Sequence, residues 1–137
     1  MAADESPKSP PVPHMDPETF RRVGHAVVDW IAEYWANVED MPVRSQVAPG
    51  DVLAALPERA PEAPGEADLW SQILRDVEQH ILPGMTHWQH PSFFAYFPAN
   101  VSAPSVLGEL LSAGLGGQGM SWQTSPAMTE LEMRVLD

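Results

Sequence analysis

The stretch from Ile81 to Met128 constrains the fold more than any other feature, because within it only Glu109 carries a formal charge. An exposed surface of that length would carry many more charges, so we expect most of it to be buried in a core, a pocket or a subunit interface. Within the stretch, Thr86 to Pro98 holds five aromatic residues and two histidines at no helical or strand period. Such a run favours the apolar wall of a small-molecule pocket, with an ordinary core as the alternative.

The composition argues against several kinds of partner. The chain has 137 residues, enough for one domain with a core, and 19 acidic against 7 basic residues give it a net charge of −12. This charge argues against binding to nucleic acid or to an anionic membrane, and no apolar run is long enough to span a bilayer. The sequence has no cysteine and no apolar signal-peptide segment, so we expect a cytoplasmic protein.

Helix caps and hydrophobic periodicity predict helices, with no alternation of strand and helix. Residues 1–15 are rich in proline and are expected to form a disordered tail. The first helix is expected from Asp16 to Val38, with Asp16 as its cap and Pro17 in its first turn. Its apolar residues lie on more than one face, which predicts packing on two sides. Further helices are expected at 51–56, 66–82, 102–115 and from 125 onward.

Three other local patterns bear on function. No stop signal closes the last predicted helix before Asp137, so we expect the chain to be truncated, part of a longer polypeptide. His87 and His90 lack a third ligand nearby in sequence, so no metal site is predicted. The glycine-rich segment 114–119 follows no strand, which favours a tight turn over a nucleotide-binding loop.

Several irregular motifs occur in order along the second half of the chain. They are Pro83-Gly84-Met85-Thr86-His87-Trp88, Phe93-Phe94-Ala95-Tyr96-Phe97-Pro98, Ser121-Trp122, Ser125-Pro126-Ala127 and Thr129-Glu130-Leu131-Glu132. On these motifs, the chain from about residue 15 to its end resembles the pyridoxal-phosphate-dependent aromatic-L-amino-acid decarboxylases, the group II decarboxylases. Members of that family are several times longer and are homodimers with the fold-type I, aspartate-aminotransferase-like α/β fold.

The resemblance implies a mainly α segment that contains the N-terminal helical domain and the first helices of such an enzyme. Residues 16–100 would form the N-terminal helical and dimerisation segment with the substrate-pocket loop. Residues 101–137 would begin the large domain that binds pyridoxal phosphate. The implied partners are the rest of the same polypeptide, the second subunit of a homodimer and an aromatic amino acid substrate.

The resemblance also implies substrate-binding residues, and no catalytic or cofactor-binding residue in this segment. Positions that line the pocket for the aromatic ring match Trp88, Tyr96, Phe97, Pro98 and Ala99. Positions that reach into the partner subunit's site match Gln118 and Met120. Ala99 stands where many members have Thr or Ser, and Gln118 and Met120 replace an apolar and an aromatic residue of animal members. These departures leave the choice of amino acid open.

The lysine count gives an independent reason to expect no catalysis from this segment alone. A pyridoxal enzyme holds its cofactor through a lysine Schiff base, and the only lysine here is Lys8, in the Pro-rich segment. The cofactor would therefore be bound by residues beyond 137. Two alternatives remain: a free-standing acidic helical interaction module without catalysis, and part of a related aromatic aldehyde synthase.

Overall fold

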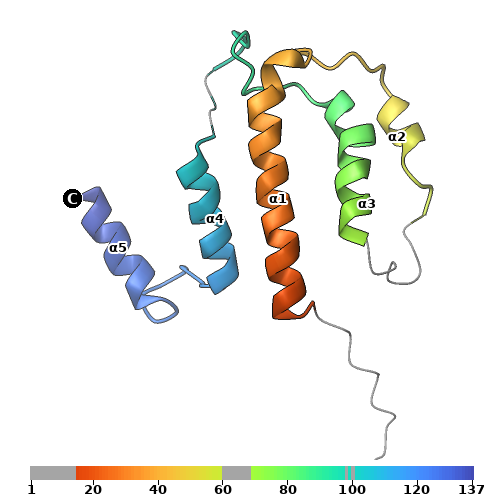
Figure 1. Cartoon of the computed structure of the whole chain (residues 1–137). Coiled ribbons are helices and arrows are strands. Elements are labelled where there is room, and N and C mark those ends of the chain that lie inside the picture. Colours follow the sequence, from red (N-terminus) through yellow and green to blue (C-terminus); the bar gives the residue numbers. More distant parts are fainter. Residues whose placement is uncertain (1–14, 60–68, 98, 100) are drawn as a thin grey trace, which may run out of the picture. The chain divides into compact units, whose positions relative to one another are not determined.

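The computed structural model describes residues 15–59, 69–97, 99 and 101–137 (Figure 1). The described residues form helices and no strand, which confirms the prediction of a mainly α segment. None of these helices is long and apolar enough to cross a membrane. They belong to two compact units, one ending at Phe93 and one beginning at Phe94. The predicted tail and the predicted start of the second long helix, at 66–68, lie outside the described residues.

The first unit begins with α1 (Pro17–Asn37), which starts where the sequence predicts. The Asp16 carboxylate accepts hydrogen bonds from the backbone amides of Glu18 and Thr19, at 3.0 and 2.9 Å. A 3-10 turn, η1 (Val38–Asp40), follows directly. Val23 and Val38 are buried, but Val28 is 42% exposed. Packing of α1 on a second side therefore stays a prediction.

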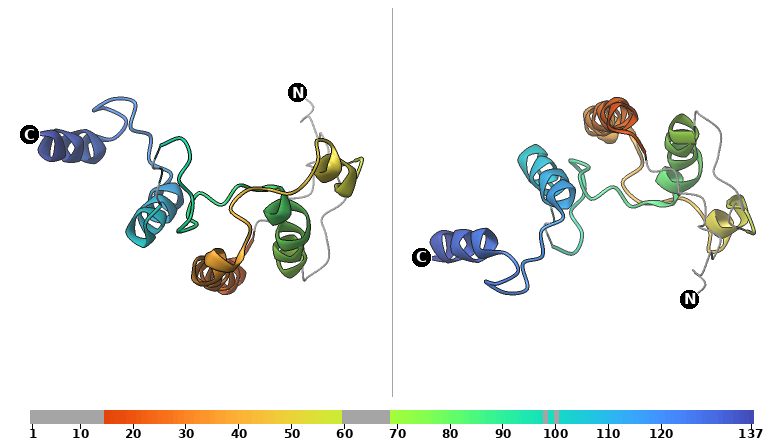
Figure 2. Two further views of the ribbon diagram at one scale, coloured as in Figure 1. Left: turned by 90° about the horizontal axis from the view of Figure 1, so that it is seen from above. Right: turned by 90° about the horizontal axis from the view of Figure 1, so that it is seen from below.

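The same unit continues with α2 (Asp51–Ala55) and α3 (Leu69–Asp76). The sequence predicts one α-helix as far as Leu82, but the chain changes to a π turn, η2 (Val77–Ile81), and then to a 3-10 turn, η3 (Leu82–Gly84). The ring of Pro83 excludes a regular α-helical continuation, which accounts for the irregular end. In all views α3 lies between α1 and α2 (Figures 1 and 2).

A close backbone approach joins α2 to the end of this irregular helix. A Cβ atom added at Gly84 would lie 2.7 Å from Cγ2 of Val52 in α2. Glycine is therefore the residue that lets α2 pack here, since any larger side chain would force Val52 to move.

The second unit contains α4 (Ala103–Leu115) and α5 (Pro126–Leu136), both close to the predicted bounds. Ser102 caps α4 and exchanges hydrogen bonds with Ser105, and Ser125 caps α5. Gly116 ends α4 at φ 60°, the left-handed conformation that favours glycine. The predicted tight turn in 114–119 is thus confirmed at this glycine.

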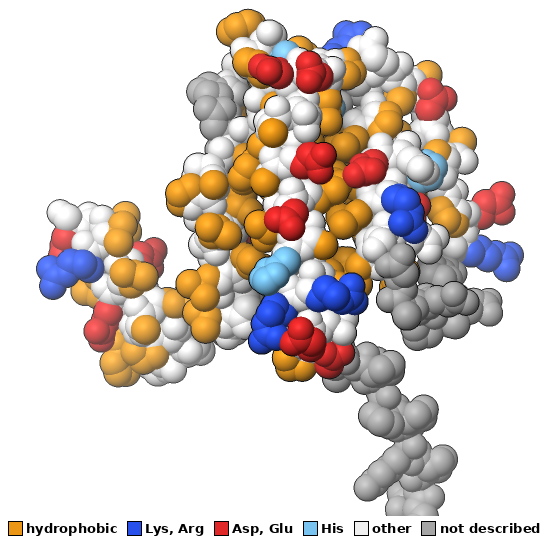
Figure 3. Space-filling model, viewed as in Figure 1, with side chains coloured by type: hydrophobic (Ala, Val, Ile, Leu, Met, Phe, Trp, Pro, Cys, Tyr) orange, Lys and Arg blue, Asp and Glu red, His pale blue; other side chains and the backbone are white. Residues whose placement is uncertain are grey.

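Burial differs most from the prediction in the second unit. Figure 3 shows hydrophobic side chains at the surface of both of its helices. Large apolar residues that are at least half exposed include Leu107, Leu110, Leu111, Leu115, Leu131, Met133, Val135 and Leu136. The core alternative for the uncharged stretch is therefore wrong for this unit by itself, because its described helices do not cover one another's apolar faces. The pocket and interface alternatives stay predictions.

Candidate functional site

The aromatic segment leaves the first unit from an anchored histidine. His87 is 3% exposed, and its Nδ1 lies 2.9 Å from the hydroxyl of Tyr34 on α1. Its backbone amide donates to the carbonyl of Val43 at 2.9 Å. These bonds connect three parts of the chain that are distant in sequence, so the start of the segment has a fixed position relative to α1.

The Tyr34–His87 pair is uncharged at neutral pH. Burial lowers the pKa of His87, and the neighbouring His90 lowers it further. Burial also raises the pKa of Tyr34. The two rings lie at a centroid distance of 5.7 Å. The hydrogen bond between them is therefore one between two neutral groups.

His90 has both ring nitrogens in hydrogen bonds. Its Nδ1 lies 2.9 Å from the backbone amide of Ser92, which must donate, so the ring proton is on Nε2. That nitrogen lies 3.2 Å from the carbonyl of Glu39 and donates to it. His90 therefore stabilises the turn that follows His87. In the part of the chain that the structure describes, no three His, Cys, Asp or Glu residues are grouped to hold a metal ion.

The predicted pocket residues fall in different units. Trp88 is in the first unit, half-buried, with its ring 4.8 Å from the ring of Phe93. Tyr96, Phe97 and Ala99 are in the second unit, where Tyr96 is 86% exposed. Pro98 lies outside the described residues. Trp88 is thus placed with Phe93, and the other aromatic residues form an exposed segment of their own unit.

Tyr96 has a backbone conformation that is rare for its residue type. Its φ is 58°, the one positive value among the described residues other than glycine. A bulky side chain in this left-handed region costs about 1–2 kcal/mol. Such strain is concentrated at functional sites, where the orientation of a particular side chain matters.

The two residues matched to a partner-subunit site lie after α4. Gln118 and Met120 are both exposed, in the turn between α4 and α5. There is little space for a side chain at Gly119 between them, because a Cβ atom there would lie 3.0 Å from Cε of Met128. The turn therefore presents both side chains on the surface of this chain.

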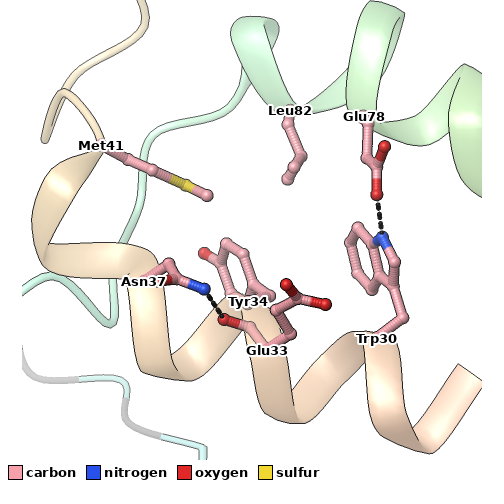
Figure 4. Close-up of a pocket in the computed structure, with 7 residues that line it drawn as sticks. All are labelled: Trp30, Glu33, Tyr34, Asn37, Met41, Glu78 and Leu82. Carbon is pink, nitrogen blue, oxygen red and sulfur yellow. Dashed lines mark hydrogen bonds between the residues drawn. The ribbon is translucent and has the colours of Figure 1, made fainter.

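One feature of the first unit was missed in the sequence. A hollow of about 200 Å³ lies between α1 and the turns η2 and η3, which contribute Glu78 and Leu82 (Figure 4). Trp30, Glu33, Tyr34 and Asn37 line its α1 side at helical spacing, i, i+3, i+4 and i+7. That spacing is a signal present in the sequence, although it does not by itself distinguish the lining of a hollow from an ordinary helix surface.

Comparison with known proteins identifies the family. Residues 49–137 match the pyridoxal-dependent decarboxylase conserved domain, which is more than half of the chain. The chain therefore belongs to the pyridoxal-dependent decarboxylase family, which confirms the resemblance and supports pyridoxal phosphate as the cofactor of its members.

Individual relatives are plant enzymes of aromatic amino acid metabolism. The chain is 58% identical over 123 residues to phenylacetaldehyde synthase of Arabidopsis thaliana, covering 90% of this chain and 24% of the relative. It is 50% identical over 127 residues to tyrosine decarboxylase 4 of Petroselinum crispum, covering 93% and 24%. The crystal structure of Catharanthus roseus tryptophan decarboxylase with L-tryptophan matches with a TM-score of 0.83 and 46% identity, covering 90% of this chain and 26% of that one. The chain thus spans about a quarter of these relatives.

The described residues do not fit the cofactor by themselves. None of them is a lysine, so none can form the Schiff base that holds pyridoxal phosphate.

Proposed function

We propose that this chain is the N-terminal part of a pyridoxal-phosphate-dependent decarboxylase that acts on aromatic L-amino acids. Its contribution is one wall of the substrate pocket and part of a dimer interface. The observation that carries the proposal is the aromatic segment. It is tied to α1 through His87, and beyond Phe93 it presents aromatic side chains that this chain leaves exposed. Exposed aromatic rings of this density suit contact with a ring-shaped ligand or a second surface.

The individual roles follow from side-chain chemistry. Trp88, Tyr96 and Phe97 would contact the aromatic ring of the substrate, with Pro98 and Ala99 completing the wall. Gln118 and Met120 would reach the site of the partner subunit. The strained backbone of Tyr96 supports this assignment, since a bulky residue at positive φ implies that its orientation is used.

Two substitutions in the protein expressed from its complete reading frame test the wall. Phe97→Ala removes apolar contact with the ring and should lower kcat/KM by about 5- to 150-fold, which corresponds to the roughly 1–3 kcal/mol that burying a large side chain contributes. Ala99→Thr adds a hydroxyl and should shift preference toward tyrosine or DOPA relative to phenylalanine or tryptophan. Leu53→Ala, at an exposed residue of α2, is the control. If the ratio of kcat/KM for tyrosine or DOPA to kcat/KM for phenylalanine or tryptophan is unchanged in both wall variants, the pocket lies elsewhere.

A related aromatic aldehyde synthase is the second candidate, favoured by the 58% identity to phenylacetaldehyde synthase. The two activities differ in their products. Loss of carbon dioxide alone gives an amine, whereas an aldehyde requires oxidation of the carbon that bears nitrogen and therefore consumes an oxidant such as dioxygen. Measuring amine, aldehyde and oxygen uptake from L-phenylalanine separates them. Amine without oxygen uptake supports the decarboxylase.

A homodimer and a cytoplasmic location belong to the same proposal. The apolar faces of α4 and α5 support burial against further chain or a second subunit. Light scattering of the whole protein and cell fractionation test the two points. If the 137-residue chain were instead a free-standing interaction module, its complete reading frame would encode no further lysine-containing cofactor domain. In either case the isolated chain should neither decarboxylate amino acids nor form a site-specific adduct with pyridoxal phosphate.

A further inference from the structure

The hollow between α1 and the π turn combines aromatic and acidic walls. The rings of Trp30 and Tyr34 are nearly parallel, at 5°, with centroids 6.0 Å apart. Glu33 extends from α1 and Glu78 from the opposite helix, and both side chains point into the space between the helices (Figure 4). Leu82 and Met41 supply an apolar end. Aromatic faces and carboxylates around one small volume are the groups that bind organic cations.

The acidic groups of the hollow lack a cation among the residues that line it. The lining contains two carboxylates and no Lys, Arg or His. Glu78 already accepts a hydrogen bond of 2.7 Å from the indole nitrogen of Trp30, which fixes its direction. A carboxylate has about four acceptor positions, so Glu78 can accept from an ammonium group as well.

The π turn accounts for the position of Glu78. Residues 77–81 are wound more widely than an α-helix, and Glu78 lies in that turn. Single π turns within helices are frequent at functional sites, because the extra residue re-aims side chains. Glu78 lies in this turn, and its carboxylate accepts the hydrogen bond from the indole nitrogen of Trp30.

We propose that this hollow binds a small aromatic primary amine, with the ammonium group between Glu33 and Glu78 and the ring against Leu82 and Met41. The identity of the ligand rests on the proposed function, since an arylethylamine is the product of an aromatic amino acid decarboxylase. The parent amino acid carries an additional carboxylate, which the two glutamates repel. The hollow therefore distinguishes amine from amino acid by charge.

Fluorine NMR of protein containing 5-fluorotryptophan tests the proposal in the protein expressed from its complete reading frame, with the Trp30→Phe variant identifying the Trp30 signal. Titration with 2-phenylethylamine should move this signal saturably. Titration with 3-phenylpropionate, which has the same ring and the opposite charge, should leave it in place. The signal of Trp88, in the proposed substrate wall, reports separately on the active site.

Variants at the two carboxylates give the quantitative test. Glu33→Gln and Glu78→Gln keep size and shape, and each should raise the dissociation constant about two- to fivefold, the range for partly exposed charge pairs. Asp29→Asn, also exposed on α1 but not lining the hollow, should leave it unchanged. A Trp30 signal unmoved by the amine, or moved equally by 3-phenylpropionate, would overturn the proposal, whatever the variants do. A response at Trp30 in a protein without turnover would refute only the proposed function.

Discussion

Replacing Tyr34 with Phe tests whether the hydrogen bond to His87 anchors the aromatic segment. The substitution removes one hydroxyl and keeps the ring that packs against Trp30. It leaves Nδ1 of His87 without this partner, in a residue that is 3% exposed and has little access to replacement water. An unsatisfied buried polar group costs about 1–3 kcal/mol, so local opening around His87 should become about 5- to 150-fold more frequent.

Hydrogen exchange of the His87 backbone amide measures this opening directly. The amide donates to Val43 in the closed form and exchanges only when that bond breaks. The amide of Gly116, bonded to Ser112 and Ala113 at the end of α4, is an internal control and should not change. In a His87→Phe background the effect of Tyr34→Phe should disappear, since the acceptor is gone. A change below about twofold at His87 would refute the anchoring role.

Three further predictions follow from local geometry. The pKa of His87 is lowered from 6.5 in the folded chain, so the unfolded state binds the proton first as the pH falls below about 6.5. The free energy of unfolding should therefore fall below about pH 6.5 and stay constant above it. Denaturant titrations at several pH values should show this dependence, and it should be lost in His87→Gln. The pKa of Asp16 is lowered, chiefly by its hydrogen bond from the Thr19 amide, so its stabilisation of α1 is present above about pH 3.8 and is lost as acid protonates the carboxylate. Circular dichroism should show a loss of helix in acid that is smaller in Asp16→Ala. Gly84→Ala should destabilise the fold by about 1–3 kcal/mol through the clash with Val52. Gly108→Ala, in open space on α4, should instead stabilise it by about 0.5–1 kcal/mol. Thermal melts of the two variants measure both effects.

Local signals allowed the helices to be predicted from the sequence. Asp16 caps α1 as expected, and Ser102 and Ser125 cap helices whose starts were predicted at residues 102 and 125. A capping side chain acts within three residues of its own position, so its effect can be recognised locally. The π turn at Val77–Ile81 was not predicted, since it keeps an apolar pattern compatible with a regular helix. Its presence depends on what packs against it, and α2 is in contact with it.

The site was predictable only in part, for a related reason. The composition of residues 86–98 indicated a pocket wall, and the motifs indicated the family, without any knowledge of three-dimensional contacts. The anchoring of His87 by Tyr34 spans 53 positions and has no local sequence signal. The same holds for Trp30 and Glu78, which are 48 positions apart. Long-range pairs of polar groups need the fold before they can be recognised.

The exposure of the second unit connects these observations to the family assignment. Leu107, Leu110 and Leu111 are spaced by three and four residues on α4, so they form one continuous face and not scattered surface residues. On α5, Leu131 and Val135 repeat the same spacing. Each buried leucine would contribute about 1.5–3 kcal/mol, so an uncovered face of this size is a large source of free energy for association. The relatives have further chain of about three times this length, since the match covers about a quarter of each of them. We therefore expect the exposed leucines of the uncharged stretch to become buried in the assembly proposed above, against further chain or a second subunit.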